Sequence, residues 1–181
     1  MASRMSKKLI RITLIIAVLT LVGGALSCNS SLLSQEAPDF ILPTMTGSVI
    51  TLSELEGTPV VLNFWATWCV YCVDELPYFE SVAQESEGTI KVIAINVGQS
   101  ASMVQDFWQN FFGYEPTMIV ALDENSEVFV SYCEKDNPRW YIPITFFIDS
   151  EGIVQHIKIG AFTSETELWE TLHDLFGTAI P

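Results

Sequence analysis

Asn63-Phe64-Trp65-Ala66-Thr67-Trp68-Cys69-Val70-Tyr71-Cys72 is the stretch of sequence that decides the fold. It begins within an apolar run, Val60 to Trp65, whose β-branched and aromatic residues predict a buried strand. After the run, apolar residues recur at steps of four, three and three, which places them on one helical face: Cys72, Leu76, Phe79 and Val82. The pattern therefore predicts a strand followed by a helix, with Cys69 at the N-terminus of the helix.

The spacing of the two cysteines favours a reversible disulfide. At a helix N-terminus, unpaired N–H groups and the helix dipole lower the pKa of a thiol and so favour the nucleophilic thiolate of Cys69. Cys72 lies one turn further along, within the Cα separation that a disulfide tolerates. We therefore expect Cys69 to attack a substrate disulfide and Cys72 to resolve the mixed disulfide. This chemistry needs no metal and no organic cofactor.

Two other interpretations of the cysteine pair have less support. A permanent disulfide across so short a loop would remove little entropy from the unfolded chain. A structural zinc site would need two further ligands. The remaining candidates for such ligands are single and scattered along the chain: Cys28, Cys133, His156 and His173.

The segment from Asn63 to Pro77 resembles the active site of the thioredoxin superfamily, and most of all its membrane-tethered TlpA/ResA-like branch. The resemblance extends to residues 37–40, 52–57 and 143–149 and covers most of the chain beyond residue 35. It implies an α/β, thioredoxin-like fold: a mixed central sheet flanked by helices, with an N-terminal β-hairpin and a central strand-helix insertion. It also implies an enzyme, a thiol-disulfide oxidoreductase that reduces protein disulfides.

The resemblance assigns a proton-handling role to Glu75. Thioredoxin carries an aspartate on the strand before its active site, but Asn63 stands there in this chain and cannot titrate. The TlpA/ResA-like branch has a glutamate three residues after its second cysteine, the position of Glu75. A helical offset of three brings that carboxylate within reach of the Cys72 sulfur, and apolar neighbours would raise its pKa. An exposed helix glutamate is the alternative.

The resemblance also identifies a substrate-binding loop. A cis-proline faces the cysteine pair in thioredoxin folds, and Pro143 matches it, with the backbone of Ile142 pairing with the bound substrate strand. A proline that merely begins a strand is the alternative. Trp68, Trp140 and Tyr141 are candidates to line the substrate groove, with core packing as the competing explanation.

Strands and helices are expected to alternate through the rest of the domain. The predicted strands are 60–65, 90–97, 118–121, 144–148 and 153–159, and the predicted hairpin pairs 40–42 with 49–52. A helix ending near Gly113 is expected to pack an aromatic stripe on the sheet, namely Val104, Phe107, Trp108 and Phe111. Further helices are expected over 124–133 and after Ser164, which forms a capping box with Glu167.

The N-terminus resembles an export signal. Four basic residues precede an apolar stretch, Ile12 to Leu26, which is short for a bilayer span. We divide the chain into a signal or membrane anchor (1–27), a linker (28–35) and a thioredoxin-like domain (36–181). Cys28 follows Ala25-Leu26-Ser27 as in a bacterial lipobox, so lipidation of Cys28, an uncleaved anchor and free secretion all stay open. Each places the domain outside the cytoplasm, and the first two tether it to the membrane of a bacterial cell envelope.

Charge restricts the partners. All 22 acidic residues lie at or after Glu36, against four basic residues, so this part of the chain carries a net charge of −18. Nucleic acid is excluded as a partner, and an anionic membrane would repel the domain, so membrane residence depends on the N-terminal tether. The acidic surface keeps the domain soluble; electrostatic steering of basic substrates is the alternative.

The expected partners follow from the family. Reduction of protein disulfides, including the cysteine pair of apocytochrome c during cytochrome c maturation, is the leading function, with a membrane-embedded thiol reductant as the electron donor. The alternatives are a disulfide-forming oxidase, a thiol peroxidase, and a copper-delivering protein that binds Cu(I) through Cys69, Cys72 and His156.

Overall fold

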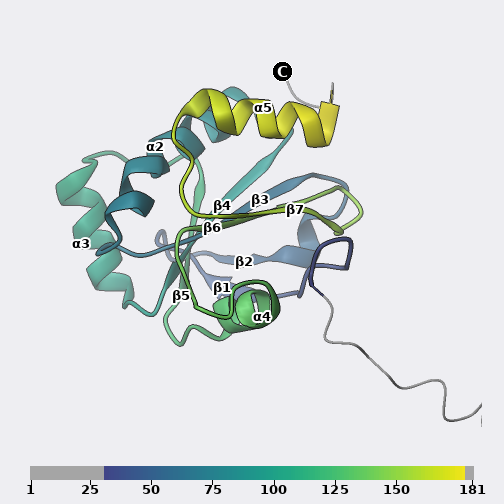
Figure 1. Ribbon diagram of the computed structural model, residues 1–181. Helices are drawn as coiled ribbons and strands as arrows, with labels where there is room; N and C mark the ends of the chain where they lie inside the picture. The colour runs from purple at the N-terminus through teal and green to yellow at the C-terminus, as the bar shows by residue number, and fades with distance from the viewer. Residues whose placement is uncertain (1–30, 178–181) are drawn as a thin grey trace, which may run out of the picture. The chain divides into compact units, whose positions relative to one another are not determined.

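The computed structural model describes residues 31–177, so the predicted export signal and Cys28 lie outside the described residues. Within residues 31–177, the main sheet has five strands in the order β5-β4-β3-β6-β7 (Figure 1). Their bounds are Ile119–Asp123 (β5), Lys91–Val97 (β4), Val60–Trp65 (β3), Ile144–Ile148 (β6) and Val154–Ile159 (β7). β3, β4 and β5 run parallel, whereas β6 and β7 pair antiparallel, which confirms the predicted mixed sheet.

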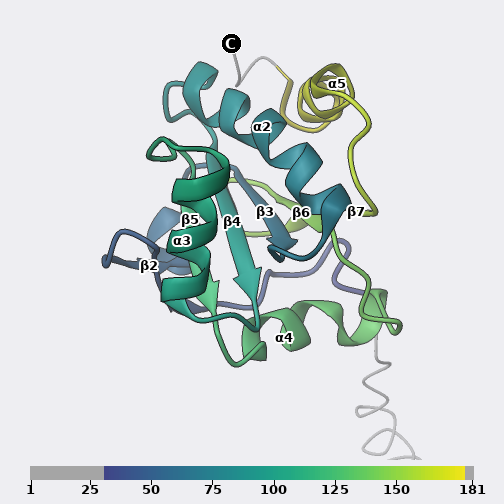
Figure 2. The same ribbon diagram turned by 90° about the vertical axis from the view of Figure 1, so that its left-hand side faces the viewer.

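Helices cover both faces of this sheet. On one face lie α2 (Val70–Glu85), α3 (Ala101–Phe111) and α5 (Glu165–Phe176). The other face is covered by α4 (Glu127–Asp136) and the small sheet of β1 (Ile41–Pro43) and β2 (Val49–Thr51). Figure 1 shows α5 above the sheet and α4 below it, and Figure 2 shows α2 and α3 beside each other in front of the sheet.

The central strand β3 shows why both faces are covered, because all six of its residues are buried. Val61 and Trp65 pack against the helices α2, α3 and α5, whereas Leu62 and Phe64 pack toward α4 and the hairpin. Side chains alternate between the two faces of a strand, so Asn63 points to the same face as Val61 and Trp65. A polar residue thus enters the core directly beneath α2.

The N-terminal hairpin forms as predicted. Its strands pair with Leu42 opposite Ile50, and Gly47 occupies the turn with φ of 85°, a conformation that glycine adopts without steric cost. Thr44 bridges to Ala121 of β5, so the hairpin extends the edge of the main sheet. This contact covers backbone groups of β5 that would otherwise be unpaired.

Three expectations need correction. The domain includes residues 31–35, which the sequence assigned to the linker: Leu32 is buried, and Ser34 N–H donates to Val154 O at 2.8 Å. Helix α4 begins at Glu127 rather than at residue 124, because the Asp123 carboxylate accepts the Phe129 N–H at 2.8 Å and starts the helix later. Phe111, expected in the core, is exposed, since it lies in the last turn of α3.

No helix within residues 31–177 has the length and apolar character needed to cross a bilayer.

Candidate active site

The two cysteines lie where β3 passes into α2. Cys69 is the N-cap of α2, and its Sγ accepts a hydrogen bond from the Cys72 backbone N–H at 3.2 Å. The two residues form a disulfide with their Cα atoms 5.2 Å apart. Cys72 is fully buried, while Cys69 keeps 7% of its surface exposed. An N–H group directed at this sulfur would favour a thiolate on Cys69, and Cys69 is the more exposed of the two cysteines.

The cis-proline loop lies against this pair, as the family resemblance implied. The Ile142–Pro143 peptide bond is cis, and the Ile142 carbonyl oxygen lies 3.8 Å from Cys69 Sγ. β6 begins at the next residue, so the loop is anchored to the centre of the sheet. An extended peptide that paired with the backbone of Ile142 would therefore lie directly over the sulfur of Cys69.

Asn137, a residue that the sequence did not single out, fixes the shape of this loop. Its side-chain amide donates to the Tyr141 carbonyl at 2.6 Å and accepts from the Tyr141 N–H at 3.0 Å. Its backbone carbonyl accepts the Trp140 N–H at 2.8 Å, where Trp140 has a left-handed φ of 56°. An asparagine followed by proline is a turn signal that could have identified it.

Gln99 plays a similar part for the loop that carries Cys69. Its Oε1 accepts the Thr67 N–H at 2.8 Å, and its Nε2 donates to Thr67 Oγ1 at 2.7 Å. Asn96 donates to the same Oε1 at 3.0 Å, which fixes the orientation of the Gln99 amide. Because Gln99 and Thr67 are 32 residues apart, no local sequence pattern pointed to this contact.

Four exposed aromatic residues neighbour either the cysteine pair or the cis-proline loop in the sequence, and we call them the aromatic rim. Its four members have 43% to 72% of their surface exposed: Trp68, Tyr71, Trp140 and Tyr141. Trp68, Trp140 and Tyr141 are thus not core residues, although the Trp140 and Phe129 ring centroids lie 5.7 Å apart; that the three line a substrate groove stays a prediction. Exposed apolar side chains beside a reactive group are typical of a surface that binds another molecule.

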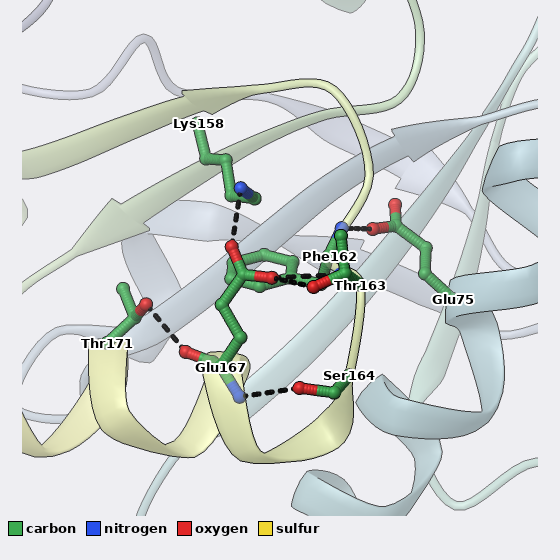
Figure 3. A network of polar contacts seen from close by, with 7 residues as sticks. All are labelled: Glu75, Lys158, Phe162, Thr163, Ser164, Glu167 and Thr171. Carbon is green, nitrogen blue, oxygen red and sulfur yellow. Dashed lines mark hydrogen bonds and ion pairs between the residues drawn. The ribbon is translucent and has the colours of Figure 1, made fainter.

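Glu75 lies in the second turn of α2 and is completely buried, so the alternative of an exposed glutamate is wrong. Its Oε1 accepts from Asn63 Nδ2 at 2.9 Å, and its Oε2 accepts from the Phe162 backbone N–H at 2.7 Å. Figure 3 shows the carboxylate of Glu75 pointing at the Phe162 amide. In the disulfide form, the carboxylate is thus held by two nitrogen donors.

Burial raises the pKa of Glu75 to about 7, because the ionised carboxylate is desolvated. The hydrogen bonds from Phe162 and Asn63 and the positive charge of Lys158 act in the opposite direction and lower the pKa, while the charge of Glu167 raises it further. A carboxyl group with a pKa near neutrality can both accept and release a proton at physiological pH. This is the property that a proton acceptor for Cys72 requires.

The residues around Phe162 form a polar network, drawn in Figure 3. Lys158 Nζ pairs with Glu167 Oε1 at 2.8 Å and lies 4.8 Å from the centroid of the Phe162 ring. Glu167 Oε2 accepts from both the N–H and the hydroxyl of Thr163 at 2.8 Å, and Ser164 caps α5 through the Glu167 N–H. The network fixes the segment that presents the Phe162 N–H to Glu75.

The remaining candidate ligands and thiols lie elsewhere. His156 is exposed on β7, with its ring 5.7 Å from that of Phe147. Within residues 31–177, no group of three or more His, Cys, Asp or Glu side chains is placed to hold a metal ion. Cys133 is buried in α4, and burial raises the pKa of its thiol to about 12, which makes it unreactive.

A mixed sheet with a helix-capping cysteine pair and a facing cis-proline defines a thioredoxin-like protein with a redox-active dithiol. Comparison with known proteins supports this class. The model of the Redoxin family matches residues 33–172, and thiol-disulfide oxidoreductase ResA of Bacillus subtilis is 35% identical over 131 residues, 71% of this chain and 68% of ResA. The chain therefore belongs to the Redoxin family of the thioredoxin superfamily and is a TlpA/ResA-like thiol-disulfide oxidoreductase acting on protein thiols and disulfides.

Solved structures show the same fold. The crystal structure of StoA from Bacillus subtilis has a TM-score of 0.59 and 27% identity, covering 74% of this chain and 96% of StoA. The crystal structure of the pneumococcal exposed lipoprotein thioredoxin Etrx1 from Streptococcus pneumoniae has a TM-score of 0.64 and 25% identity, covering 76% of this chain and all of Etrx1.

Proposed function

We propose that the protein works in the reducing direction, outside the cytoplasm, as a membrane-tethered reductase of protein disulfides. The observation that carries this proposal is the site itself: a dithiol at a helix N-terminus above the buried carboxyl group of Glu75, with no basic side chain between Trp68 and Glu75. Strong oxidants of this superfamily owe their oxidising power to a stabilised reduced form. Nothing in this segment supplies the positive charge that would stabilise a thiolate so strongly.

The reaction begins with the reduced dithiol. The Cys69 thiolate attacks one sulfur of the substrate disulfide; that S–S bond breaks, and a mixed disulfide forms while the other substrate sulfur leaves and takes up a proton. Cys72 then loses its proton and attacks Cys69 Sγ, which releases the second substrate thiol and closes the Cys69–Cys72 bond. Two electrons pass from the dithiol to the substrate, whose two sulfurs end as thiols.

In this reaction Glu75 accepts the proton of Cys72 and passes it on to solvent or to the leaving thiolate. Its burial, its pKa of about 7 and its place on α2 one turn after Cys72 support the role. The Ile142 backbone and Trp68 bind the substrate strand, and cis-Pro143 holds Ile142 in place. The reaction needs no cofactor besides the Cys69–Cys72 pair, which itself carries the two electrons.

The reduction potential tests the direction. We would equilibrate the full-length protein in detergent with glutathione buffers and quantify the Cys69–Cys72 disulfide. A reductase should lie nearer the potential of thioredoxin, about −270 mV, than that of DsbA, about −120 mV. A value above roughly −150 mV would identify a disulfide-forming oxidase instead. A Cys72→Ser variant would then trap clients as mixed disulfides, and a thiol peroxidase would show itself by peroxide consumption in the same variant.

The clients that we propose are exported proteins with closely spaced cysteines, apocytochrome c among them, and the proposed electron donor is a thiol reductant embedded in the membrane. The tether is the N-terminal segment, with lipidation at Cys28; similarity to an exposed lipoprotein thioredoxin supports this location. Fatty-acid labelling and fractionation of wild type and Cys28→Ala test it. Loss of label and release of Cys28→Ala from membranes is the expected result, whereas membrane retention of the unlabelled variant would indicate an uncleaved anchor.

A further inference from the structure

Asn63 makes an unusual set of contacts for a fully buried residue. Its Nδ2 uses both hydrogens, donating to Glu75 Oε1 at 2.9 Å and to Thr145 Oγ1 at 3.0 Å. Its Oδ1 has no hydrogen-bond partner among the residues that the structure describes. A buried polar atom without a partner costs free energy, so this arrangement needs an explanation.

The bonds of Asn63 suit only one protonation state of Glu75. Nδ2 can donate to an ionised carboxylate, but it cannot accept the proton of a carboxylic acid. Phe162 N–H is also a donor, so both oxygens of Glu75 face donors. When Glu75 takes up a proton, the new O–H group meets no acceptor at either of these contacts.

A half-turn of the Asn63 amide resolves this mismatch. The rotation exchanges Oδ1 and Nδ2, so that Oδ1 accepts from the Glu75 O–H and also from the hydroxyl of Thr145, which can both donate and accept. Each orientation then makes two hydrogen bonds and leaves one end of the amide unpaired. The two orientations are balanced except for the proton on Glu75, which selects between them.

We propose that Asn63 is a positioning residue whose side-chain amide rotates by half a turn as Glu75 gains or loses a proton. In one orientation it donates to the carboxylate, and in the other it accepts from the carboxylic acid. Its catalytic significance rests on the proposed role of Glu75 as proton acceptor for Cys72. Asn63 then lets Glu75 hold a proton in the core without leaving the acid unpaired.

The other groups that act on Glu75 do not switch between donating a hydrogen bond to it and accepting one from it. Lys158 of β7 and Glu167 of α5 act on it through their charges, but they pair with each other at 2.8 Å. The Phe162 amide is fixed as a donor. Thr145 lies opposite Asn63 in the β3–β6 pairing, so the strand register holds its hydroxyl beside the Asn63 amide.

Nuclear magnetic resonance of the full-length protein in detergent, with its disulfide closed, tests the rotation directly. Neither active-site cysteine titrates in that form, so no substrate or turnover is involved. We would follow the Glu75 carboxyl carbon and the cross peak between the Asn63 amide protons and the Thr145 side chain from pH 5 to pH 9. The cross peak should be present when Glu75 is ionised and lost when it is protonated, with the same midpoint for both signals.

Glu75→Gln provides the matched control, because its neutral amide can donate to Asn63 Oδ1 at every pH. In this variant the cross peak to Thr145 should be absent throughout, whereas Thr145→Ser should retain the pH-dependent change. A cross peak that persists through the titration of Glu75, or that disappears with a different midpoint, would overturn the proposal. Because the readout is structural, this result is independent of whether the protein reduces disulfides.

Discussion

Burial of the Glu75 carboxyl group lowers the free energy of unfolding by an amount that depends on pH. Asn63 and Phe162 together supply only two donors, whereas a carboxylate in water is surrounded by many. The site thus keeps Glu75 poised between its two protonation states at the expense of stability. Sacrificing stability for a tuned group is common at functional sites.

Replacing Glu75 with Gln should therefore change how stability depends on pH. Its pKa of about 7 in the folded protein exceeds the ordinary value of 4.5, so the folded state binds this proton more tightly. The resulting stabilisation is complete below pH 4.5 and is lost as the pH rises through 7, a change of about 3 kcal/mol. Urea unfolding of the disulfide form at pH 4.5 and pH 8 should show Glu75→Gln gaining about that amount over wild type at the higher pH. Parallel pH profiles would contradict the assignment.

Lys158 should influence Glu75 without contributing much to stability. Its ion pair with Glu167 is partly exposed, so Lys158→Met should cost less than about 1 kcal/mol in urea unfolding. Removing the positive charge should nevertheless raise the pKa of Glu75, because Lys158 favours the ionised carboxylate. The carboxyl carbon resonance of Glu75 measures this shift, and Lys91→Met on β4 is a control for loss of a distant charge. An unchanged midpoint in Lys158→Met would refute the coupling.

Residues were predictable from the sequence where the signal was local. Cys69 and Cys72 lie in one turn at the start of a periodic helix, so their placement followed from the chain itself, whereas the cis-Pro143 opposite them followed from the family resemblance. Gln99 and Asn63 act through partners 32 and 82 residues away, which only the folded sheet brings together. The direct contact between Asn63 and Glu75 was likewise invisible, although both positions had been singled out.

Helix ends show how element boundaries depend on side chains. α5 begins as its capping box predicted, with Ser164 Oγ accepting the Glu167 N–H at 3.2 Å. α4 lacks such a cap: Ser126 is its N-cap with φ of 61° and makes no side-chain capping bond. The Asp123 carboxylate replaces it from the end of β5, a contact that periodicity alone did not reveal.

These two serines form a matched pair for mutation. Ser164→Ala removes a capping hydrogen bond and should lower the free energy of unfolding by about 1 kcal/mol. Ser126→Ala removes no capping bond and should change it by less than about half that amount. Urea unfolding at one pH measures both values. Equal losses in the two variants would show that the Ser164 bond contributes nothing specific.

The loop before the cis-proline depends on Asn137. Asn137→Ala leaves the N–H and carbonyl of Tyr141 without their side-chain partners, while the backbone bond to Trp140 is retained. We expect kcat/KM for a protein disulfide to fall about tenfold, equivalent to roughly 1.4 kcal/mol in the transition state. The rate of Cys69 alkylation by a small reagent should stay within twofold of wild type, because that reaction does not use the loop. A parallel fall in alkylation would place the defect at the cysteine instead.

At the scale of the whole molecule, the alternation of strands and helices predicted the sheet and both covering layers. The order β5-β4-β3-β6-β7 brings β3 and β6 together at the centre, and with them the cysteine pair and the cis-proline. This adjacency followed from family resemblance, not from periodicity. The apolar patterns contain little information on which strand pairs with which, because β3, β4, β5 and β6 are all almost completely buried. Only β7 differs, since most of its residues are exposed or half-buried, as expected for an edge strand.

The net charge of the domain would act on charged substrates before any contact is made. With 22 acidic and four basic residues beyond residue 35, the domain should repel anionic peptides at low ionic strength and attract cationic ones. We therefore expect disulfide peptides of one core sequence to be reduced faster with lysine flanks than with glutamate flanks at about 10 mM salt. At about 300 mM salt, where screening acts within roughly 6 Å, the two rates should converge. Stopped-flow fluorescence with a neutral-flanked peptide as control measures this ratio. A ratio independent of salt would mean that the acidic surface serves solubility alone, and that recognition depends on the aromatic rim and the Ile142 backbone.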